Sequence, residues 1–360
     1  MTALKKLCEA GQSVWLDSIS RDMLENGTLA RYVSDLSVTG LTSNPTIFER
    51  AIASTDRYDP AIRSRLGEGL SPEELFFAFA LEDIGAAADL FRPIYDATGG
   101  CDGFASLEVS PTLADDAAAT IAEGKALFER AARPNVLIKV PGTEAGCSAI
   151  EELIFAGVPI NVTLLFSRSH YQGAAEAYLR GLERRLEAGL DLHVPSVASL
   201  FISRWDRHTA SLLPPEFANR IGIAIAHRSY KVYRRILASE RWQRLARAGA
   251  APQRLLWAST GTKDPALPQS YYVTALAASE TVNTMPEKTL LDFAEHGEVG
   301  GVLTEDTSEA DRVIERARET GVDGDALAAK LQSEGRDLFV ESWNELLQCV
   351  DAKRNAMKTA

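Results

Sequence analysis

The segment Asn135–Thr143, which reads N-V-L-I-K-V-P-G-T, indicates how the chain folds. Only Lys139 interrupts its apolar run, and such a run is typical of a strand buried on both faces in a parallel sheet. Pro141 and Gly142 predict that the strand ends directly after Val140. Lys139 therefore lies near the carboxyl end of the strand, where barrels of parallel strands carry their catalytic groups.

A lysine is unexpected inside such a strand. Burying an ammonium group without a partner costs several kcal/mol, so an interior lysine usually loses its proton. A neutral amine is a nucleophile that can attack a ketone and form a Schiff base. On this segment alone, the more common explanation for Lys139 is a structural lysine paired with a buried carboxylate, since such pairs also occur in cores. Evidence from the other strands is needed to choose between the two.

Seven further short segments have the composition of strands, and each is followed by helical periodicity. They are Val14–Asp17, Val38–Asn44, Phe104–Val109, Ile160–Phe166, Leu192–Phe201, Leu255–Thr260 and Glu280–Met285. Pro195 argues against regular pairing along the whole of the sixth strand. The pattern predicts a single closed (β/α)8 TIM barrel over residues 1–360. A doubly wound open sheet is the alternative, but no GxGxxG or P-loop glycine pattern follows any strand.

Additional helices are expected beyond the barrel repeat. A long basic amphipathic helix is predicted over Glu216–Arg247, and a shorter one near Pro268–Ala278. Two C-terminal helices, over Ser308–Thr320 and Asp325 to about Ala356, should pack on the barrel within residues 306–357.

Composition restricts the classes of partner. The 360 residues carry a net charge of −12, which argues against a nucleic-acid or membrane-binding surface. The four cysteines and five histidines show no metal-ligand spacing, so we expect no metal and no other cofactor. Scattered cysteines, no signal peptide and no run of eighteen apolar residues predict a cytoplasmic protein. A few clustered basic groups would still suffice to hold a phosphorylated substrate.

Polar side chains recur near the carboxyl ends of seven predicted strands. Because side chains alternate between the two faces of a strand, residues two apart share a face. The set comprises Asp17, Thr42, Asn44, Glu108, Lys139, Asn161, Thr163, Ser199 and Ser259. Each residue alone is more often a satisfied polar group at a strand end. Agreement among seven strands favours an active site at one opening of the barrel.

This set of groups predicts Schiff-base chemistry. An amine needs a proton acceptor and donor nearby to form and later hydrolyse a carbinolamine, and Glu108 could serve through a water. Cleaving the carbon–carbon bond of a β-hydroxy iminium requires a base at the hydroxyl, for which Asp17 is the candidate. The protonated imine accepts the electrons, so no metal is required.

Phosphate recognition is expected in the later loops, as is common in barrels. Residues 199–204, S-L-F-I-S-R, put a hydroxyl and the guanidinium of Arg204 just past the sixth strand. Residues 259–263, S-T-G-T-K, add hydroxyls and the ammonium of Lys263 past the seventh. Arg204 alone is more often an exposed residue at a helix start. Together with Lys263, a phosphate site is favoured.

Three segments together resemble the transaldolase family. They are Gly40–Phe48 (G-L-T-S-N-P-T-I-F), the strand that carries Lys139, and Asn161–Ser167 (N-V-T-L-L-F-S). The likeness runs from about Val14 to Met285 and includes the order of all eight strands. The length and the S-T-G-T-K loop resemble the longer bacterial form of the enzyme.

The resemblance implies a role for each residue. Lys139 would be the Schiff-base lysine and Asp17 the acid/base for carbon–carbon cleavage, while Glu108 and Thr163 would position the catalytic water. The implied substrate-binding residues are Thr42, Asn44, Asn161, Ser199, Phe201, Arg204, Ser259 and Lys263. Among these, Asn44 and Asn161 would bind hydroxyls of the dihydroxyacetone moiety, and Ser199 and Arg204 would hold the phosphate. By analogy, the last helix would cross the barrel near the mouth of the site.

The chain departs from the pattern of the shorter members at two places. Those members have Ser-Pro-Phe followed by Gly-Arg at the sixth strand, where this chain has Leu200 and Ser203 at the intervening positions. They also use an arginine after the seventh strand, where Lys263 is the nearest cation and lacks bidentate geometry.

The implied reaction moves a dihydroxyacetone unit from sedoheptulose 7-phosphate to glyceraldehyde 3-phosphate, a non-oxidative step of the pentose phosphate pathway. Similar small fructose 6-phosphate aldolases share the lysine but typically lack the glutamate and carry a tyrosine at the position of Phe201. Glu108 and Phe201 thus favour transfer over simple cleavage, with an aldolase as the first alternative. A non-catalytic sugar-phosphate-binding barrel is the second. Either a monomer or a homodimer is compatible with the sequence.

Overall fold

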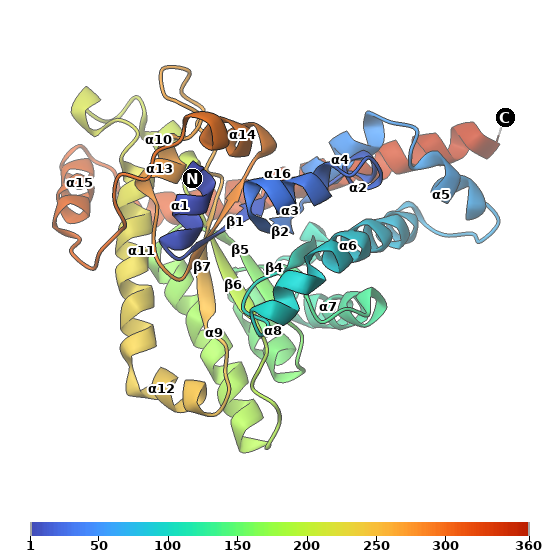
Figure 1. Ribbon diagram of the computed structural model, residues 1–360, viewed down its shortest axis with the longest axis horizontal. Helices are drawn as coiled ribbons and strands as arrows, with labels where there is room; N and C mark the ends of the chain where they lie inside the picture. Colours follow the sequence, from blue (N-terminus) through green and yellow to red (C-terminus); the bar gives the residue numbers. More distant parts are fainter. Residues whose placement is uncertain (1, 359–360) are drawn as a thin grey trace.

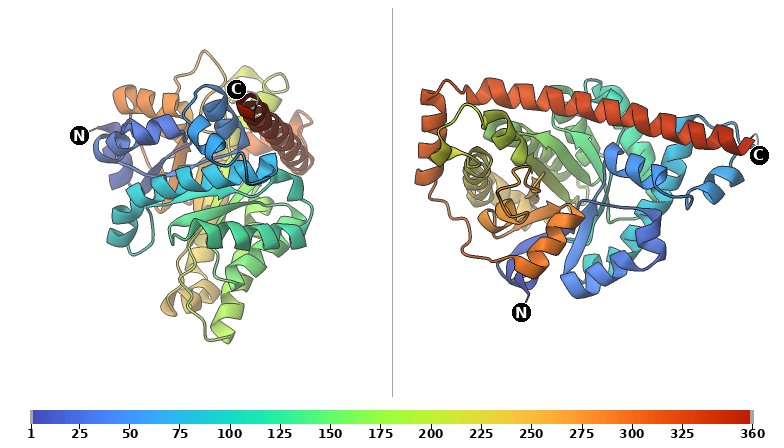
Figure 2. Two further views of the ribbon diagram at one scale, coloured as in Figure 1. Left: turned by 90° about the vertical axis from the view of Figure 1, so that its right-hand side faces the viewer. Right: turned by 90° about the horizontal axis from the view of Figure 1, so that it is seen from above.

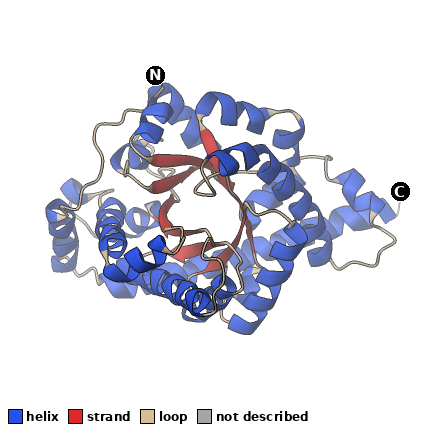
Figure 3. Ribbon diagram, turned by 60° about the horizontal axis from the view of Figure 1, so that its bottom comes forward, coloured by secondary structure: helices blue, strands red, loops and turns tan. Residues whose placement is uncertain are grey.

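The computed structural model describes residues 2–358 and contains a closed barrel of eight parallel strands (Figures 1 and 3). The strands are β1 (Gln12–Leu16), β2 (Val38–Thr42), β3 (Ala105–Glu108), β4 (Val136–Pro141), β5 (Ile160–Leu165), β6 (Ser196–Phe201), β7 (Gln253–Ala258) and β8 (Thr281–Met285). β1 pairs with β8 from Gln12↔Thr281 to Leu16↔Met285, which closes the sheet. The predicted (β/α)8 barrel is confirmed, and the open doubly wound sheet is wrong.

Helices surround the ring of strands (Figure 3). They are α1 (Ala3–Glu9), α2 (Arg21–Glu25), α3 (Thr28–Leu36), α4 (Pro45–Ala53), α5 (Asp59–Ser64), α6 (Pro72–Ala97), α7 (Ala117–Ala131), α8 (Glu144–Phe155), α9 (Arg168–Glu187), α10 (Ser203–Thr209), α11 (Ile221–Ala238), α12 (Glu240–Arg247), α13 (Tyr271–Ala275), α14 (Glu287–His296), α15 (Ser308–Glu319) and α16 (Gly324–Lys358), with 3-10 turns η1 (Pro111–Leu113) and η2 (Pro215–Phe217). None of the helices within residues 2–358 combines the length and apolar character that crossing a membrane requires.

Two predicted element boundaries are wrong for identifiable reasons. The sixth strand begins at Ser196 rather than Leu192, because Pro195 has no N–H to donate to a neighbouring strand. The helix predicted over Glu216–Arg247 is instead η2, α11 and α12 in succession. Ser239 has extended backbone angles, so it ends α11, and its side chain accepts a hydrogen bond from the Trp242 amide to begin α12.

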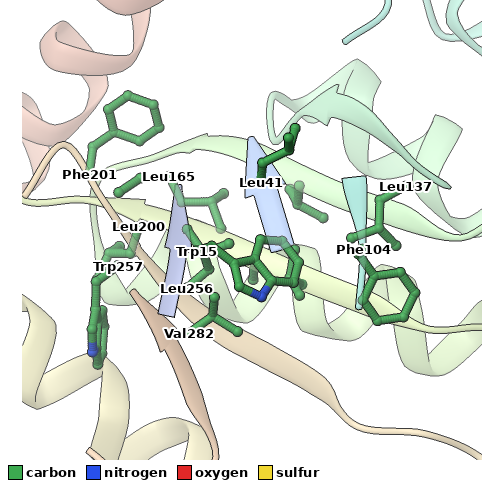
Figure 4. Close-up of a cluster of buried hydrophobic side chains, with 14 of the residues drawn as sticks. Trp15, Leu41, Phe104, Leu137, Leu165, Leu200, Phe201, Leu256, Trp257 and Val282 are labelled. Carbon is green, nitrogen blue, oxygen red and sulfur yellow. The ribbon is translucent and has the colours of Figure 1, made fainter. Parts of the chain in front are cut away.

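The amino ends of the strands are filled by buried side chains, among them Trp15 and Phe104, whose ring centroids are 6.1 Å apart (Figure 4). The Trp15 indole Nε1 donates to the Asp102 carboxylate at 2.8 Å, which satisfies its polar atom. The Ser13 hydroxyl donates to the same carboxylate at 2.5 Å. This end of the barrel is packed, so the opposite end is the one available for a site.

The helix α16 runs along one side of the molecule, as Figure 2 shows, and extends beyond the barrel toward the C-terminus. It packs against α4, α5 and α6, and it also reaches η1 and β5. The preceding helix α15 packs on α11. Through these contacts the last part of the chain meets the loops that follow β2, β3 and β5.

Gly40 generates a test of packing inside the barrel. A Cβ atom at Gly40 would lie 2.7 Å from the Phe104 carbonyl oxygen and 2.7 Å from the Trp15 ring. We expect Gly40→Ala to lower the free energy of unfolding by about 1–3 kcal/mol, because backbone and indole have no room to move apart. Denaturant unfolding followed by circular dichroism measures this. Gly67→Ala is the control, since nothing lies within 4 Å of a Cβ there; equal midpoints for the two variants would contradict the packing argument.

Candidate active site

A cavity of about 440 Å³ opens at the carboxyl ends of the strands. Ten of the twelve predicted site residues line it: Asp17, Thr42, Asn44, Lys139, Thr163, Ser199, Phe201, Arg204, Ser259 and Lys263. The other two, Glu108 and Asn161, are buried and hydrogen-bond to the lining residues Lys139 and Ser199. The structure therefore brings the predicted set together.

The amine of Lys139 is enclosed by protein. The side chain is only 4% exposed, and Nζ donates to Glu108 Oε2 at 3.0 Å and to the Ser43 carbonyl oxygen at 3.1 Å. The strand register produces this pairing, because Glu108 on β3 and Asn161 on β5 are the direct partners of Lys139 on β4. The contact with Glu108 is direct, whereas a bridging water was predicted. At 3.0 Å, Nζ and Oε2 leave no room for a water between them.

Glu108 has one oxygen committed and one free. Its Oε1 atom and the Thr163 hydroxyl are both buried and have no hydrogen-bond partner among residues 2–358. Burial raises the pKa of Glu108, and the positive charge of Lys139 opposes that rise. Unsatisfied buried oxygens are costly, so these two atoms are suited to a ligand or a water that satisfies them.

Asp17 lies directly after β1, where its amide donates to the Met285 carbonyl oxygen at 2.7 Å. Its Oδ1 atom accepts a hydrogen bond from the Thr42 hydroxyl at 2.6 Å, and that hydroxyl is 2.7 Å from the Thr284 hydroxyl. Removal from water raises the pKa of Asp17; the Thr42 hydrogen bond and the charges of Lys139 and Lys263 oppose that rise. The positive charge of Lys139 therefore interacts with the carboxyls of both Asp17 and Glu108.

The two predicted amides occupy different environments. Asn44 is the N-cap of α4, and its Oδ1 atom accepts from the Ile47 amide at 3.0 Å. Asn161 is fully buried; its amide donates to the Ser106 hydroxyl at 3.1 Å and accepts from the Ser199 hydroxyl at 2.7 Å. Because Ser199 donates its proton to Asn161, Ser199 has no donor left for an anion in the cavity.

An unpaired guanidinium lies at the other end of the cavity. Arg204 begins α10, and within residues 2–358 its guanidinium has neither a hydrogen bond nor an ion pair. It lies 5.3 Å from the Phe201 ring and 5.9 Å from the Phe166 ring. Partial burial lowers the pKa of Arg204, as does the neighbouring charge of Arg207. The nearby Ser203 and Ser259 hydroxyls are 2.9 Å apart, and Ser259 has a φ of +57°.

Sequence reasoning missed several lining residues. They are Thr46, Ile47, Arg50, Ser203, Arg207, His208, Ala258, Gly261, Thr284, Pro286, Leu331, Glu334, Leu338 and Phe339. The Oε2 atom of Glu334, on α16, lies 2.8 Å from Nε2 of His208 and accepts a hydrogen bond when that nitrogen carries the proton. The lining residues of α16 are spaced three or four positions apart, as on one face of a helix. This spacing predicts that the face is buried, but it does not predict which part of the molecule the face contacts.

Metal and disulfide chemistry have no counterpart in the described part of the chain. Residues 2–358 contain no group of three histidine, cysteine, aspartate or glutamate side chains that could hold a metal ion. The four cysteines, Cys8, Cys101, Cys147 and Cys349, are free.

Comparison with known proteins assigns the family. A family model described as transaldolase/fructose-6-phosphate aldolase matches residues 14–350. The chain belongs to this family. It is 44% identical to a transaldolase of Frankia alni over 353 residues, 96% of this chain and 95% of the relative. Identity to a transaldolase of Thermobifida fusca is 44% over 356 residues, 96% of this chain and 97% of the relative. A Streptomyces coelicolor relative, transaldolase 2, is 42% identical over 360 residues, 98% of this chain and 97% of that protein. The resemblance predicted from the motifs is confirmed.

The buried pair makes a prediction about proton affinity. The charge of Lys139 lowers the pKa of Glu108, so Lys139→Met should raise that pKa further. The pKa can be followed by carbon NMR of glutamate-labelled protein, with Glu108→Gln to assign the resonance. Lys263→Met is the control, because Lys263 acts on the pKa of Asp17 and not on that of Glu108. An unchanged Glu108 titration in Lys139→Met would contradict the coupling.

Proposed function

We propose that the protein is a transaldolase that transfers a dihydroxyacetone unit from sedoheptulose 7-phosphate to glyceraldehyde 3-phosphate, giving erythrose 4-phosphate and fructose 6-phosphate. The observation that carries the proposal is the buried Lys139 amine, 3.0 Å from Glu108, in a cavity that also contains an unpaired guanidinium. Its relatives named transaldolase support the same conclusion. The protein would act in the non-oxidative pentose phosphate pathway, and its free cysteines favour the reducing cytoplasm.

The first step forms the Schiff base. Glu108 has a raised pKa and contacts Nζ directly, so it can accept a proton from the amine. The neutral nitrogen of Lys139 then adds to the ketone carbon of the substrate, and the carbonyl oxygen takes up a proton. Glu108 returns its proton to that hydroxyl, which leaves as water. The free oxygens of Glu108 and Thr163 support binding of this water.

The second step breaks a carbon–carbon bond. Asp17 removes the proton from the hydroxyl next to the bond, the hydroxyl oxygen becomes an aldehyde, and the bonding electrons move into the iminium. The product is an enamine on Lys139 and a free aldose phosphate. Asp17 must be ionised to act, and the hydrogen bond from Thr42 stabilises its carboxylate. The enamine carbon then attacks the aldehyde of the acceptor, and Asp17 returns the proton to the new hydroxyl. A water adds to the new imine carbon, which frees the ketose phosphate and the amine of Lys139.

Phosphate binding would fix the orientation of both donor and acceptor. Arg204 is an unpaired, partly buried cation, and a guanidinium presents paired donors to a phosphate. The Ser203 and Ser259 hydroxyls, together with Lys263, can add donors from the β6 and β7 loops. Ser199 is not suited to phosphate binding, because its hydroxyl donates its hydrogen bond to Asn161. We therefore assign Ser199 to orienting Asn161 toward the substrate hydroxyls.

Borohydride trapping tests the proposed mechanism. Reduction in the presence of fructose 6-phosphate should fix a three-carbon or six-carbon adduct on the peptide that contains Lys139, identified by mass spectrometry. Lys139→Met should show no adduct and a loss of turnover of at least about a thousandfold, because among residues 2–358 no other buried amine that lines this cavity contacts a carboxyl. Lys263→Met should still be labelled. A protein that binds the sugar phosphate but is not labelled at Lys139 would favour a non-catalytic barrel.

The aldolase alternative is tested with the acceptor omitted. A transaldolase should release free dihydroxyacetone from fructose 6-phosphate only slowly, at roughly a hundredth of the transfer rate or less, because the enamine stays bound. Enzymatic reduction of dihydroxyacetone with NADH oxidation followed at 340 nm measures the release. If dihydroxyacetone is released without acceptor about as fast as it is transferred to erythrose 4-phosphate, the protein is an aldolase.

A further inference from the structure

The helix α16 contributes one wall of the active-site cavity. Leu331, Glu334, Leu338 and Phe339 lie along one face of the helix and line the same space as Lys139. Phe339 is the residue nearest the chemistry, because its ring centroid lies 5.4 Å from Nζ of Lys139. The ring itself is only 6% exposed. A side chain 200 positions further along the chain thus covers the predicted reacting nitrogen.

Three groups surround the nitrogen. Glu108 Oε2 and the Ser43 carbonyl oxygen accept its hydrogen bonds, and the Phe339 ring covers a third direction. The two oxygens are polar, whereas the ring has no hydrogen-bonding atom. A water approaching from the side of the ring would find no partner there. The unsatisfied oxygens of Glu108 and Thr163 provide a polar position for water elsewhere in the site.

The position of the ring is fixed by anchors on both sides of it along α16. On one side, the Gln332 amide donates to the Gly142 and Leu164 carbonyl oxygens, each at 3.0 Å. On the other, the Ser342 hydroxyl lies 2.8 Å from that of Thr46. Trp343 then packs against the Phe76 ring, with centroids 5.2 Å apart. These contacts hold Phe339 over the amine without help from a substrate.

We propose that Phe339 is a positioning residue that keeps water from the covalent intermediate and so determines whether the three-carbon unit is transferred or released. This inference rests on the proposed transaldolase reaction. Release requires a proton on the enamine carbon, then a water on the imine carbon, and it frees dihydroxyacetone and the lysine amine. Transfer forms a carbon–carbon bond at the same enamine carbon instead. Transfer also ends with a water on the imine carbon of the new product, so the two outcomes differ only at the enamine carbon. Release needs a proton brought by water at that carbon and transfer does not, so excluding water from the ring side slows release.

The face of the ring also compensates for the missing water. An iminium nitrogen carries positive charge, and an aromatic face attracts a cation at this range. The ring can therefore stabilise the cation while it excludes the solvent that would otherwise do so. An aliphatic side chain of similar size would provide exclusion without this attraction.

The test compares release with transfer in full-length variants. We expect Phe339→Ala to raise the ratio of dihydroxyacetone released from fructose 6-phosphate alone to dihydroxyacetone transferred to erythrose 4-phosphate by roughly tenfold. Phe339→Leu should keep the ratio near the unmodified value but slow transfer, because exclusion remains and the aromatic face is lost. Phe339→Leu also gives a readout if Phe339→Ala does not fold. Leu346→Ala is the control, because Leu346 is buried on the same helix but does not line the cavity, and it should leave the ratio unchanged.

Two outcomes would overturn parts of this scheme separately. If both rates fall in parallel in Phe339→Ala, so that the ratio is unchanged, the ring has only a packing role and the inference is wrong. Borohydride labelling of the unmodified protein distinguishes this from failure of the proposed function. A labelled Lys139 with an unchanged ratio rejects the role of Phe339 alone, whereas an unlabelled Lys139 rejects the Schiff-base function and this inference with it.

Discussion

The ion pair between Lys139 and Glu108 is the interaction on which the rest of the site depends. Its two atoms are 3.0 Å apart, and both side chains are almost completely removed from water. Each charge alone would be costly in this position, so neither group is tolerated without the other. Adjacent strands in register keep them together, since Glu108 and Lys139 are direct partners on β3 and β4. A proton can pass between them without any movement of the backbone.

The barrel separates a packed end from a reactive end. Toward the amino ends of the strands, Trp15 donates a hydrogen bond to Asp102, and the cavity found there has a volume of only about 20 Å³. At the carboxyl ends, Thr163 and Glu108 retain oxygens without partners. The same alternation of side chains produces both ends, because residues two apart on a strand point to the same interior.

Strand alternation explains why the sequence predicts most of this arrangement. Polar residues at strand ends must meet if the strands close in order, and seven of the nine predicted ones line one cavity. The sequence does not predict the direction of each hydrogen bond. Whether Ser199 donates to a ligand or to Asn161 depends on the distance between β5 and β6. Phe339 could not be predicted either, since its helical face has the same periodicity whatever element it covers. The early start of the sixth strand was wrong because Pro195 ends pairing there.

Arg204 connects the phosphate end of the cavity with the helix that covers the amine. Its guanidinium lies over Phe201, and a Cβ atom at Gly335 on α16 would lie 3.0 Å from its Nη1 atom. The absence of a side chain at Gly335 therefore leaves room for the guanidinium beside α16. Gln332 and Phe339, one turn away on either side, fix the same stretch of helix. A phosphate bound by Arg204 would thus lie next to α16, the helix that holds the Phe339 ring over Lys139. Substrate binding and the exclusion of water therefore depend on the same helix.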